Sequence, residues 1–109
     1  MIRGGIDMNI NVGDYIMLKS LKDVMKLYDD CELIVDGCGK SLIAENTDFS
    51  QEMIDALGAS KVYKVERAEE DDFVIIINGN SYWFDKKCIK SVYKLVRVGT
   101  NCKYLRKVI

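Results

Sequence analysis

The chain has 109 residues, 49% of them apolar and 30% charged, with a formal net charge of −1. This length supports one hydrophobic core, and the composition is typical of a soluble globular domain. No apolar run approaches the roughly 18 residues that a membrane-spanning helix needs, and the opening MIRGGIDMNI lacks the apolar segment of a secretory signal, so we expect a cytoplasmic protein with no membrane contact.

The domain is predicted to begin after a short leader. Residues 1–11 are interpreted as a flexible leader and residues 12–109 as a single domain. A Gly13-Asp14 turn precedes the alternating segment YIML, which is typical of a strand. Ser20 then provides a helix N-cap, with Asp23 in the capping-box position. The next apolar residues share one face of a short helix, namely Leu21, Val24, Met25 and Tyr28.

The segment at about 29–48 is predicted to be an inserted β-hairpin. Its strands are CELIV and KSLIAE, and the glycines between them provide the positive φ angles of a tight turn. The sequence GCGKS resembles the end of a phosphate-binding loop. That motif requires a glycine where this chain has Ile34, so we do not expect nucleotide binding.

A second short helix is predicted after Ser50, its N-cap. Phe49 before the cap is placed to pack on Ile54, and Gly58 ends the helix. From residue 59 onward the apolar period changes to two, which indicates strands.

An Asn78-Gly79 pair between two apolar runs predicts a β-hairpin. In the register of a two-residue turn, Ile77 faces Asn80, Ile75 faces Tyr82, Phe73 faces Phe84 and Val74 faces Trp83. The segment DKKCI is predicted to be one helical turn, and KSVYKLVRV the next strand. Residues 99–109 either add another short strand or fray.

Short antiparallel strands joined by tight turns around one core predict a mainly β fold. We expect a small SH3-like barrel with two short helices and the inserted hairpin.

The pattern resembles the SH3-like repeat domain of Mind bomb-type ubiquitin ligases, which also occurs in small phage and mobile-element proteins of low-GC bacteria. The matching positions lie between Val12 and Leu95: Gly13-Asp14, the FSQEM segment, Leu57-Gly58, Tyr82-Trp83-Phe84, Ile89 and Val92. The resemblance implies a binding module for extended peptides. Three features depart from the pattern, because the segment at 29–48 is longer, Lys61 replaces a glycine, and Trp83 is shifted by one position from Tyr82, where the family carries tryptophan.

The three consecutive aromatic residues divide between two faces of the hairpin. Tyr82 and Phe84 share the face of Phe73 and Ile75 and are predicted to be core. Trp83 points the other way, so we predict that it is partly exposed and contacts a ligand. The residues predicted to bind a peptide or protein partner are Trp83, Tyr63, Tyr93, Glu70 and Asp71, the last two from the acidic turn after residue 68.

The charge is divided unequally along the chain. Residues 85–109 hold eight Lys/Arg and one Asp, a net +7, whereas residues 1–84 are net −8. This asymmetry is consistent with an anionic partner or with complementary surfaces in folding or self-association. The alternative function is therefore nucleic-acid binding, for which the candidate residues are Lys90, Lys94, Arg97, Lys103 and Tyr104.

Catalysis and metal binding are not expected. The chain has no histidine for acid–base chemistry, and its four cysteines contain no C-x-x-C pair. Without an export signal the thiols are expected to stay reduced. We predict a non-enzymatic protein without metal or cofactor, with a purely structural or phage accessory role as a further alternative.

Overall fold

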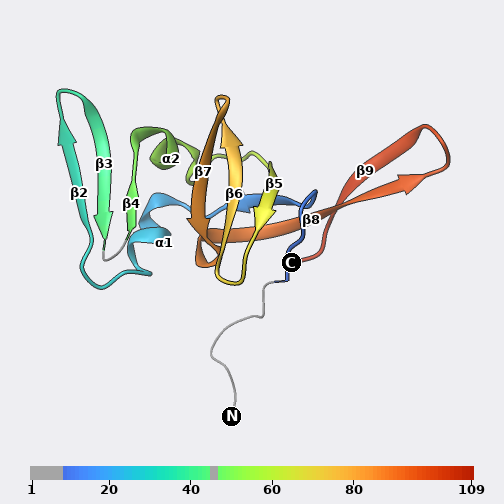
Figure 1. The fold of residues 1–109 in the computed structure, drawn as a ribbon, viewed down its shortest axis with the longest axis horizontal. Helices are drawn as coiled ribbons and strands as arrows, with labels where there is room; N and C mark the ends of the chain where they lie inside the picture. The colour runs from blue at the N-terminus through green and yellow to red at the C-terminus, as the bar shows by residue number, and fades with distance from the viewer. Residues whose placement is uncertain (1–8, 45–46) are drawn as a thin grey trace, which may run out of the picture.

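The structure, a computed structural model, describes residues 9–44 and 47–109 and is mainly β (Figure 1). One antiparallel sheet has the strand order β7-β6-β5-β1-β8-β9, and a smaller one has the order β2-β3-β4. The strands of the large sheet are β1 (Tyr15–Leu18), β5 (Tyr63–Ala68), β6 (Asp72–Ile77), β7 (Asn80–Asp85), β8 (Ile89–Val98) and β9 (Cys102–Lys107). The remaining elements are β2 (Glu32–Asp36), β3 (Gly39–Ala44), β4 (Thr47–Phe49), α1 (Leu21–Met25), α2 (Gln51–Ala56) and the 3-10 turn η1 (Lys86–Cys88).

The predicted mainly β class is confirmed, but the predicted closed barrel is not formed. The large sheet keeps two edge strands, β7 and β9. The reason lies in β8, which pairs with β1 only as far as Tyr93 and continues beyond it with β9 as its one partner in the described part of the chain. The strand therefore runs away from the body instead of curving back to meet β7.

The two predicted helices are present. The Ser20 hydroxyl accepts a hydrogen bond from the Asp23 backbone N–H at 3.2 Å, as the capping prediction requires. Ser50 occupies the N-cap of α2, but its side chain makes no capping hydrogen bond. Gly58 follows α2 with φ of +74°, a conformation that ends helices.

The predicted leader lies mostly outside the described residues, which begin at Asn9. Within its last part, Ile10 is only 4% exposed and belongs to the core cluster. The backbone N–H of Asn11 donates to the Asp14 carboxylate at 2.8 Å. The folded body therefore includes residues upstream of Val12.

The predicted inserted hairpin is confirmed as β2 and β3, paired from Glu32–Ile43 to Asp36–Gly39. The chain adds a third strand, β4, so the insertion is a small sheet. Lys40 lies within β3, where a phosphate-binding loop would begin a helix. Leu42, Ala44 and Phe49 are buried, and α2 contacts both β3 and β4.

The β6–β7 hairpin has the predicted register at every pair from Ile77–Asn80 to Phe73–Phe84. Asn78 and Gly79 have φ of 51° and 83°, as a turn with two positive φ angles requires. Phe73, Ile75 and Phe84 are buried as predicted, while Tyr82 is only partly buried. The Tyr82 hydroxyl donates a hydrogen bond to Glu52 of α2.

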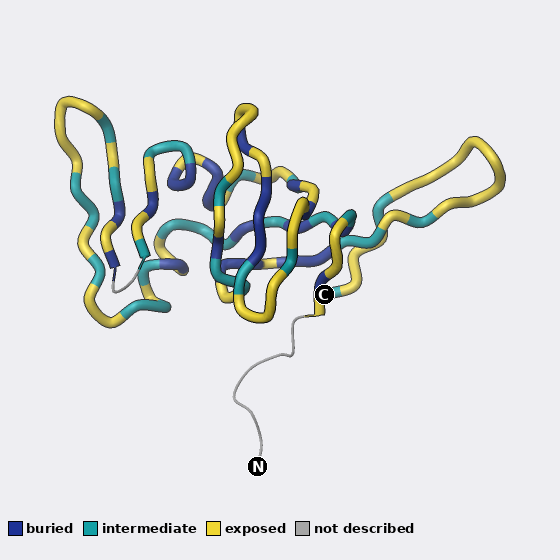
Figure 2. Tube along the Cα trace, in the orientation of Figure 1, coloured by how far each residue is buried: buried dark blue, intermediate teal, exposed yellow. Residues whose placement is uncertain are grey.

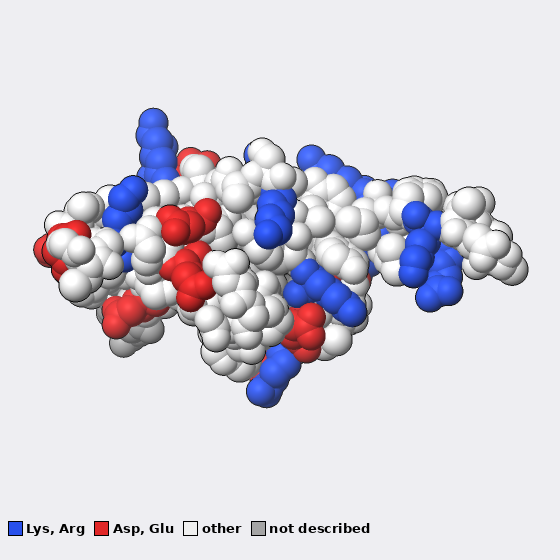
Figure 3. Space-filling view, turned by 90° about the horizontal axis from the view of Figure 1, so that it is seen from above, with Lys and Arg blue, Asp and Glu red and all other residues white. Residues whose placement is uncertain are grey.

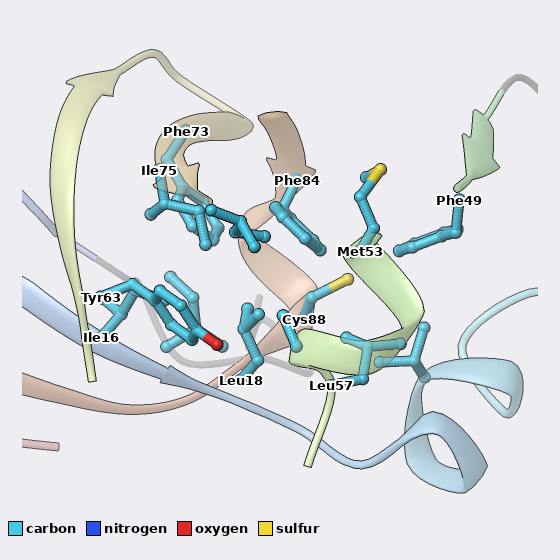
Figure 4. Close-up of a cluster of buried hydrophobic side chains, with 14 of the residues drawn as sticks. Ile16, Leu18, Phe49, Met53, Leu57, Tyr63, Phe73, Ile75, Phe84 and Cys88 are labelled. Atoms are coloured by element: carbon cyan, nitrogen blue, oxygen red, sulfur yellow. The ribbon is translucent and has the colours of Figure 1, made fainter. Parts of the chain in front are cut away.

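The core lies between the large sheet, α2 and the small sheet (Figures 2 and 4). Phe84 stacks on Phe73 with ring centroids 5.9 Å apart, and it meets Phe49 edge-on at 6.0 Å. These contacts connect the two sheets through one aromatic side chain. The core residues with the largest side chains include Phe49, Phe73, Ile16, Leu18, Leu42 and Ile75.

The second half of β8 and all of β9 form a hairpin that projects from the body (Figure 1), and we call residues 94–107 the arm. Figure 2 shows the arm as exposed or half-exposed along its length. Residues 99–109 were expected either to add a short strand or to fray. Cys102–Lys107 form a strand.

Candidate functional site

Trp83 lies on the outer face of β7, opposite Val74 of β6, and is 45% exposed. Its predicted partial exposure is confirmed. The guanidinium carbon of Arg67 lies 5.2 Å from the centre of the indole, within the range of a cation–π contact. Val74 lies between Arg67 and Trp83 in the sheet, because it pairs with both residues. The Arg67 and Trp83 side chains cover Val74, which is only 4% exposed.

A pocket of about 520 Å³ lies beside Trp83, and we call it the Trp83 pocket. Its walls come from the end of the β6–β7 hairpin, the segment after α1, and the start of β4. The lining residues are Leu27, Tyr28, Asp29, Thr47, Asp71, Asp72, Trp83, Phe84, Asp85 and Lys87. Aromatic rings and carboxylates thus dominate the lining.

Two of the carboxylates are forced together by the strand register. Asp72 of β6 lies directly opposite Asp85 of β7, and like charges in that position destabilise a sheet. Asp71 adjoins them, and Lys87 is the one basic residue in the lining. Among the described residues, neither ion pair involves these aspartates. A cation entering the pocket would relieve their repulsion.

Backbone contacts hold this edge of the pocket in place. The Asp85 carboxylate accepts a hydrogen bond from the Lys87 backbone N–H at 2.8 Å and so caps η1. The Asp71 carbonyl accepts one from the Lys86 backbone N–H at 2.9 Å. The turn before β6 is therefore tied to the turn after β7, and its acidic side chains are positioned by regular structure.

Tyr28 forms an aromatic wall of the pocket. Its ring meets Phe49 edge-on at 6.2 Å, and the Lys87 ammonium lies 5.7 Å from its centre. Burial, together with the neighbouring Cys88 thiol and the Asp85 carboxylate, raises the pKa of the Tyr28 hydroxyl. Burial likewise raises the pKa of Cys88 to about 11. Both groups stay neutral at physiological pH, so the pocket's charge comes from its aspartates and Lys87.

The predicted peptide-binding residues separate into two groups. Trp83 and Asp71 line the same pocket, and Glu70 is exposed in the adjoining turn. Tyr63 is 8% exposed and points into the core (Figure 4). Tyr93 lies on β8, opposite Tyr15 and Lys107. The structure therefore does not place Tyr63 or Tyr93 in a groove with Trp83.

Eight of the ten lining residues were not among the predicted site residues, and four of these eight matter most for the charge and aromatic character of the pocket: Tyr28, Asp29, Asp72 and Asp85. A signal for two of them was present. The predicted register, extended one pair beyond Phe73–Phe84, sets Asp72 against Asp85. Tyr28 was predicted on the apolar face of the first helix, but α1 ends at Met25, so Tyr28 and Asp29 reach the pocket through the segment that follows the helix.

The candidate nucleic-acid residues lie mainly on the arm. Arg97 and Lys103 are directly opposite each other, and Tyr104 is 50% exposed. Lys94, at the base of the arm, forms an ion pair with Asp14 at 2.5 Å. Lys90 lies apart, at a separate hollow of about 330 Å³ beside Ser20 and Gly58.

The part of the chain that the structure describes contains no group of metal-ligating side chains that would hold an ion. In residues 9–44 and 47–109, no helix has the length and apolarity to cross a bilayer. All four cysteine thiols are free, and Cys88 is buried.

Comparisons with protein-family models, with curated proteins and with solved structures found no match to this chain.

Proposed function

We propose that this protein is a non-catalytic, SH3-like binding module whose Trp83 pocket receives a lysine- or arginine-containing segment of a peptide or protein partner. The observation that carries the proposal is the half-exposed Trp83 beside Asp71, Asp72 and Asp85 in one pocket. The resemblance of the hairpin and helix residues to SH3-like repeats supports the same class of function.

The pocket suits both parts of a basic side chain. The aliphatic stem of lysine or arginine packs well on aromatic rings, and Trp83 and Tyr28 provide them. The cationic head then lies near aspartates that share one small volume. A cation over an aromatic face gains about 0.5–1 kcal/mol when exposed and about 2 or more when desolvated. Arg67 already occupies one side of the Trp83 indole, so an incoming cation approaches from the pocket side.

Fluorescence offers a direct test because Trp83 is the only tryptophan. Titration with a short Lys/Arg-rich peptide should change its emission and saturate, whereas the same peptide with Glu replacing the basic residues should not. Asp71→Asn/Asp72→Asn should weaken binding by about tenfold or more, as expected for charge pairs in a partly desolvated site. The matched control, Glu32→Gln/Glu66→Gln, removes two exposed carboxylates elsewhere. Equal affinity of all three proteins would contradict the proposal.

A second candidate function is nucleic-acid binding by the arm. It is favoured by one observation, namely that residues 94–107 hold five Lys/Arg and no acidic residue on a projecting two-stranded ribbon. Ribbons of this kind fit the major groove of DNA. Binding of this type must weaken steeply with salt, with a log–log slope of about −0.9 per neutralised phosphate on duplex DNA. Absent or salt-independent binding at low ionic strength would exclude it.

The resemblance also extends to the biological setting. We propose a bacterial cytoplasmic protein of phage or mobile-element origin, in agreement with the free thiols. The genes beside its own are the test, because phage structural genes would support an accessory role and a ligase or toxin gene would indicate a different partner.

A further inference from the structure

The arm is a segment that the body leaves without support. Among residues 9–44 and 47–109, β8 beyond Tyr93 pairs only with β9, and β9 has no other neighbour in the sheet. An isolated two-stranded hairpin is at best marginally stable in water. The arm nevertheless exposes large apolar side chains, with Leu95 44%, Val98 55% and Tyr104 50% exposed. Such a segment is stabilised by docking on another surface.

The charges of the arm and of the Trp83 pocket are complementary. The arm carries five basic residues and no acidic one, and Figure 3 shows Lys and Arg along it on the face in view. The pocket is lined by Asp29, Asp71, Asp72 and Asp85 against the single Lys87. The arm thus holds five of the eight Lys/Arg of residues 85–109, and three of the four pocket aspartates come from the acidic residues 1–84.

The arm does not point toward the pocket of its own molecule. It leaves the body at the β8–β9 edge of the large sheet, while the pocket is formed by the hairpin at the β7 edge and the segment after α1 (Figure 1). A contact between them therefore joins two copies. Because the two surfaces differ, the contact is heterologous and repeats from one copy to the next.

The tip of the arm offers suitable anchors. Arg97 and Lys103 are cross-strand partners, so their side chains leave the same face of the ribbon. The pocket volume of about 520 Å³ lies within the range of about 300–1,000 Å³ seen for small-ligand sites. It accommodates one or two side chains, and the ribbon backbone stays at the rim.

We propose that the occupant of the Trp83 pocket is the arm of a second copy of this chain, anchored by Arg97 and Lys103, so that the protein associates head to tail. This inference rests on the proposed function, since it names the partner of the same pocket. Association grows with protein concentration and weakens with salt, because its charge pairs lie near the surface.

The test uses two full-length variants with separate defects. Arg97→Gln/Lys103→Gln damages the arm and leaves the pocket intact, whereas Asp71→Asn/Asp72→Asn damages the pocket and leaves the arm intact. Light scattering after gel filtration should find each variant monomeric at concentrations where the unchanged protein associates, with the association constant lowered by about tenfold or more. Mixed in equal amounts, the two variants should form a dimer that grows no further, because only one functional arm and one functional pocket meet.

A matched control is Lys22→Gln/Lys64→Gln, which removes two exposed basic residues outside the arm and should associate like the unchanged protein. Continued association of the pocket variant alone would overturn the inference in favour of symmetric arm-to-arm contact. A monomeric unchanged protein would also overturn it, and oligonucleotide binding by that monomer would assign the arm to nucleic acid. If such a monomer still binds the basic peptide through Trp83, the proposed function survives without self-association; if it binds no basic peptide, both proposals fail.

Discussion

Replacing Phe84 by alanine would remove the side chain that joins the two sheets. Phe84 is 2% exposed, stacks on Phe73 at 5.9 Å and meets Phe49 of the small sheet at 6.0 Å. No comparable ring is available from β7, because Trp83 points outward and Tyr82 is directed toward α2. The substitution therefore leaves a cavity between elements far apart in the sequence.

The expected loss is large relative to the stability of the domain. Truncating a buried phenylalanine to alanine costs about 3–5 kcal/mol, and each aromatic pair adds about 0.5–1.5 kcal/mol beyond its buried area. We expect a loss near the upper end of the first range, out of a total that is about 5–15 kcal/mol for globular proteins. Urea denaturation followed by circular dichroism measures the free energy of unfolding directly.

Two companion variants keep the result interpretable. Phe84→Leu fills most of the volume and should destabilise less than alanine, so it covers the case in which the alanine variant does not fold. Ser81→Ala alters an exposed position on the same strand and should stay within about 0.5 kcal/mol of the unchanged protein. A Phe84→Ala loss as small as that of Ser81→Ala would refute the placement of Phe84 in the core.

Three further predictions concern acidity, reactivity and backbone conformation. Hydrogen bonds, chiefly from Tyr82, lower the pKa of Glu52 below 4.5. The contribution of these bonds to stability is therefore present above pH 4.5 and is lost as the pH falls through the folded-state pKa. NMR titration should show that the Glu52 pKa rises in Tyr82→Phe. Cys88, with its pKa raised to about 11, should resist thiol reagents at pH 8 until urea unfolds the protein, whereas the two exposed cysteines react at once. Gly79→Ala should lower the free energy of unfolding by about 1–2 kcal/mol for its positive φ alone. Gly58→Ala should lower it further in the same urea assay, because the added Cβ would lie 3.2 Å from the backbone of Ser20, the N-cap of α1.

The elements specified by local chemistry were predictable from the sequence. The β6–β7 hairpin followed from Asn78-Gly79 and the alternation on either side, because a two-residue turn fixes the register of the whole pair. The division of Phe84 and Trp83 between inner and outer faces followed from the same register. Ser20 marked the start of α1 for an equally local reason, its side-chain hydrogen bond to a backbone N–H.

The features that depend on contacts between distant segments were not predictable in this way. The prediction of a closed barrel was wrong because β8 extends past the end of β1. The sequence of β8 alternates on both sides of Tyr93, so nothing in it indicates that the pairing with β1 ends there. Tyr63 was placed on the binding surface because the period of two does not say which face of an isolated strand is the inner one. The pocket required Tyr28 and Trp83, which lie 55 positions apart in the 109-residue chain, to line the same cavity.

Strand β7 carries both the core and the candidate site, and this arrangement bears on what the pocket can bind. Phe84 anchors the strand between the two sheets while also lining the pocket, and the next side chain, Trp83, projects outward. Six cross-strand pairs with β6 hold that register, so the pocket residues on these strands are positioned before a ligand arrives. The cost of ordering on association then falls mainly on the incoming segment. A segment whose strand pairing limits its freedom, such as the β8–β9 arm, loses less conformational freedom on docking than a flexible peptide with the same charge. Under the proposed function, the pocket is expected to bind a basic ribbon more tightly than a disordered tail with the same charge.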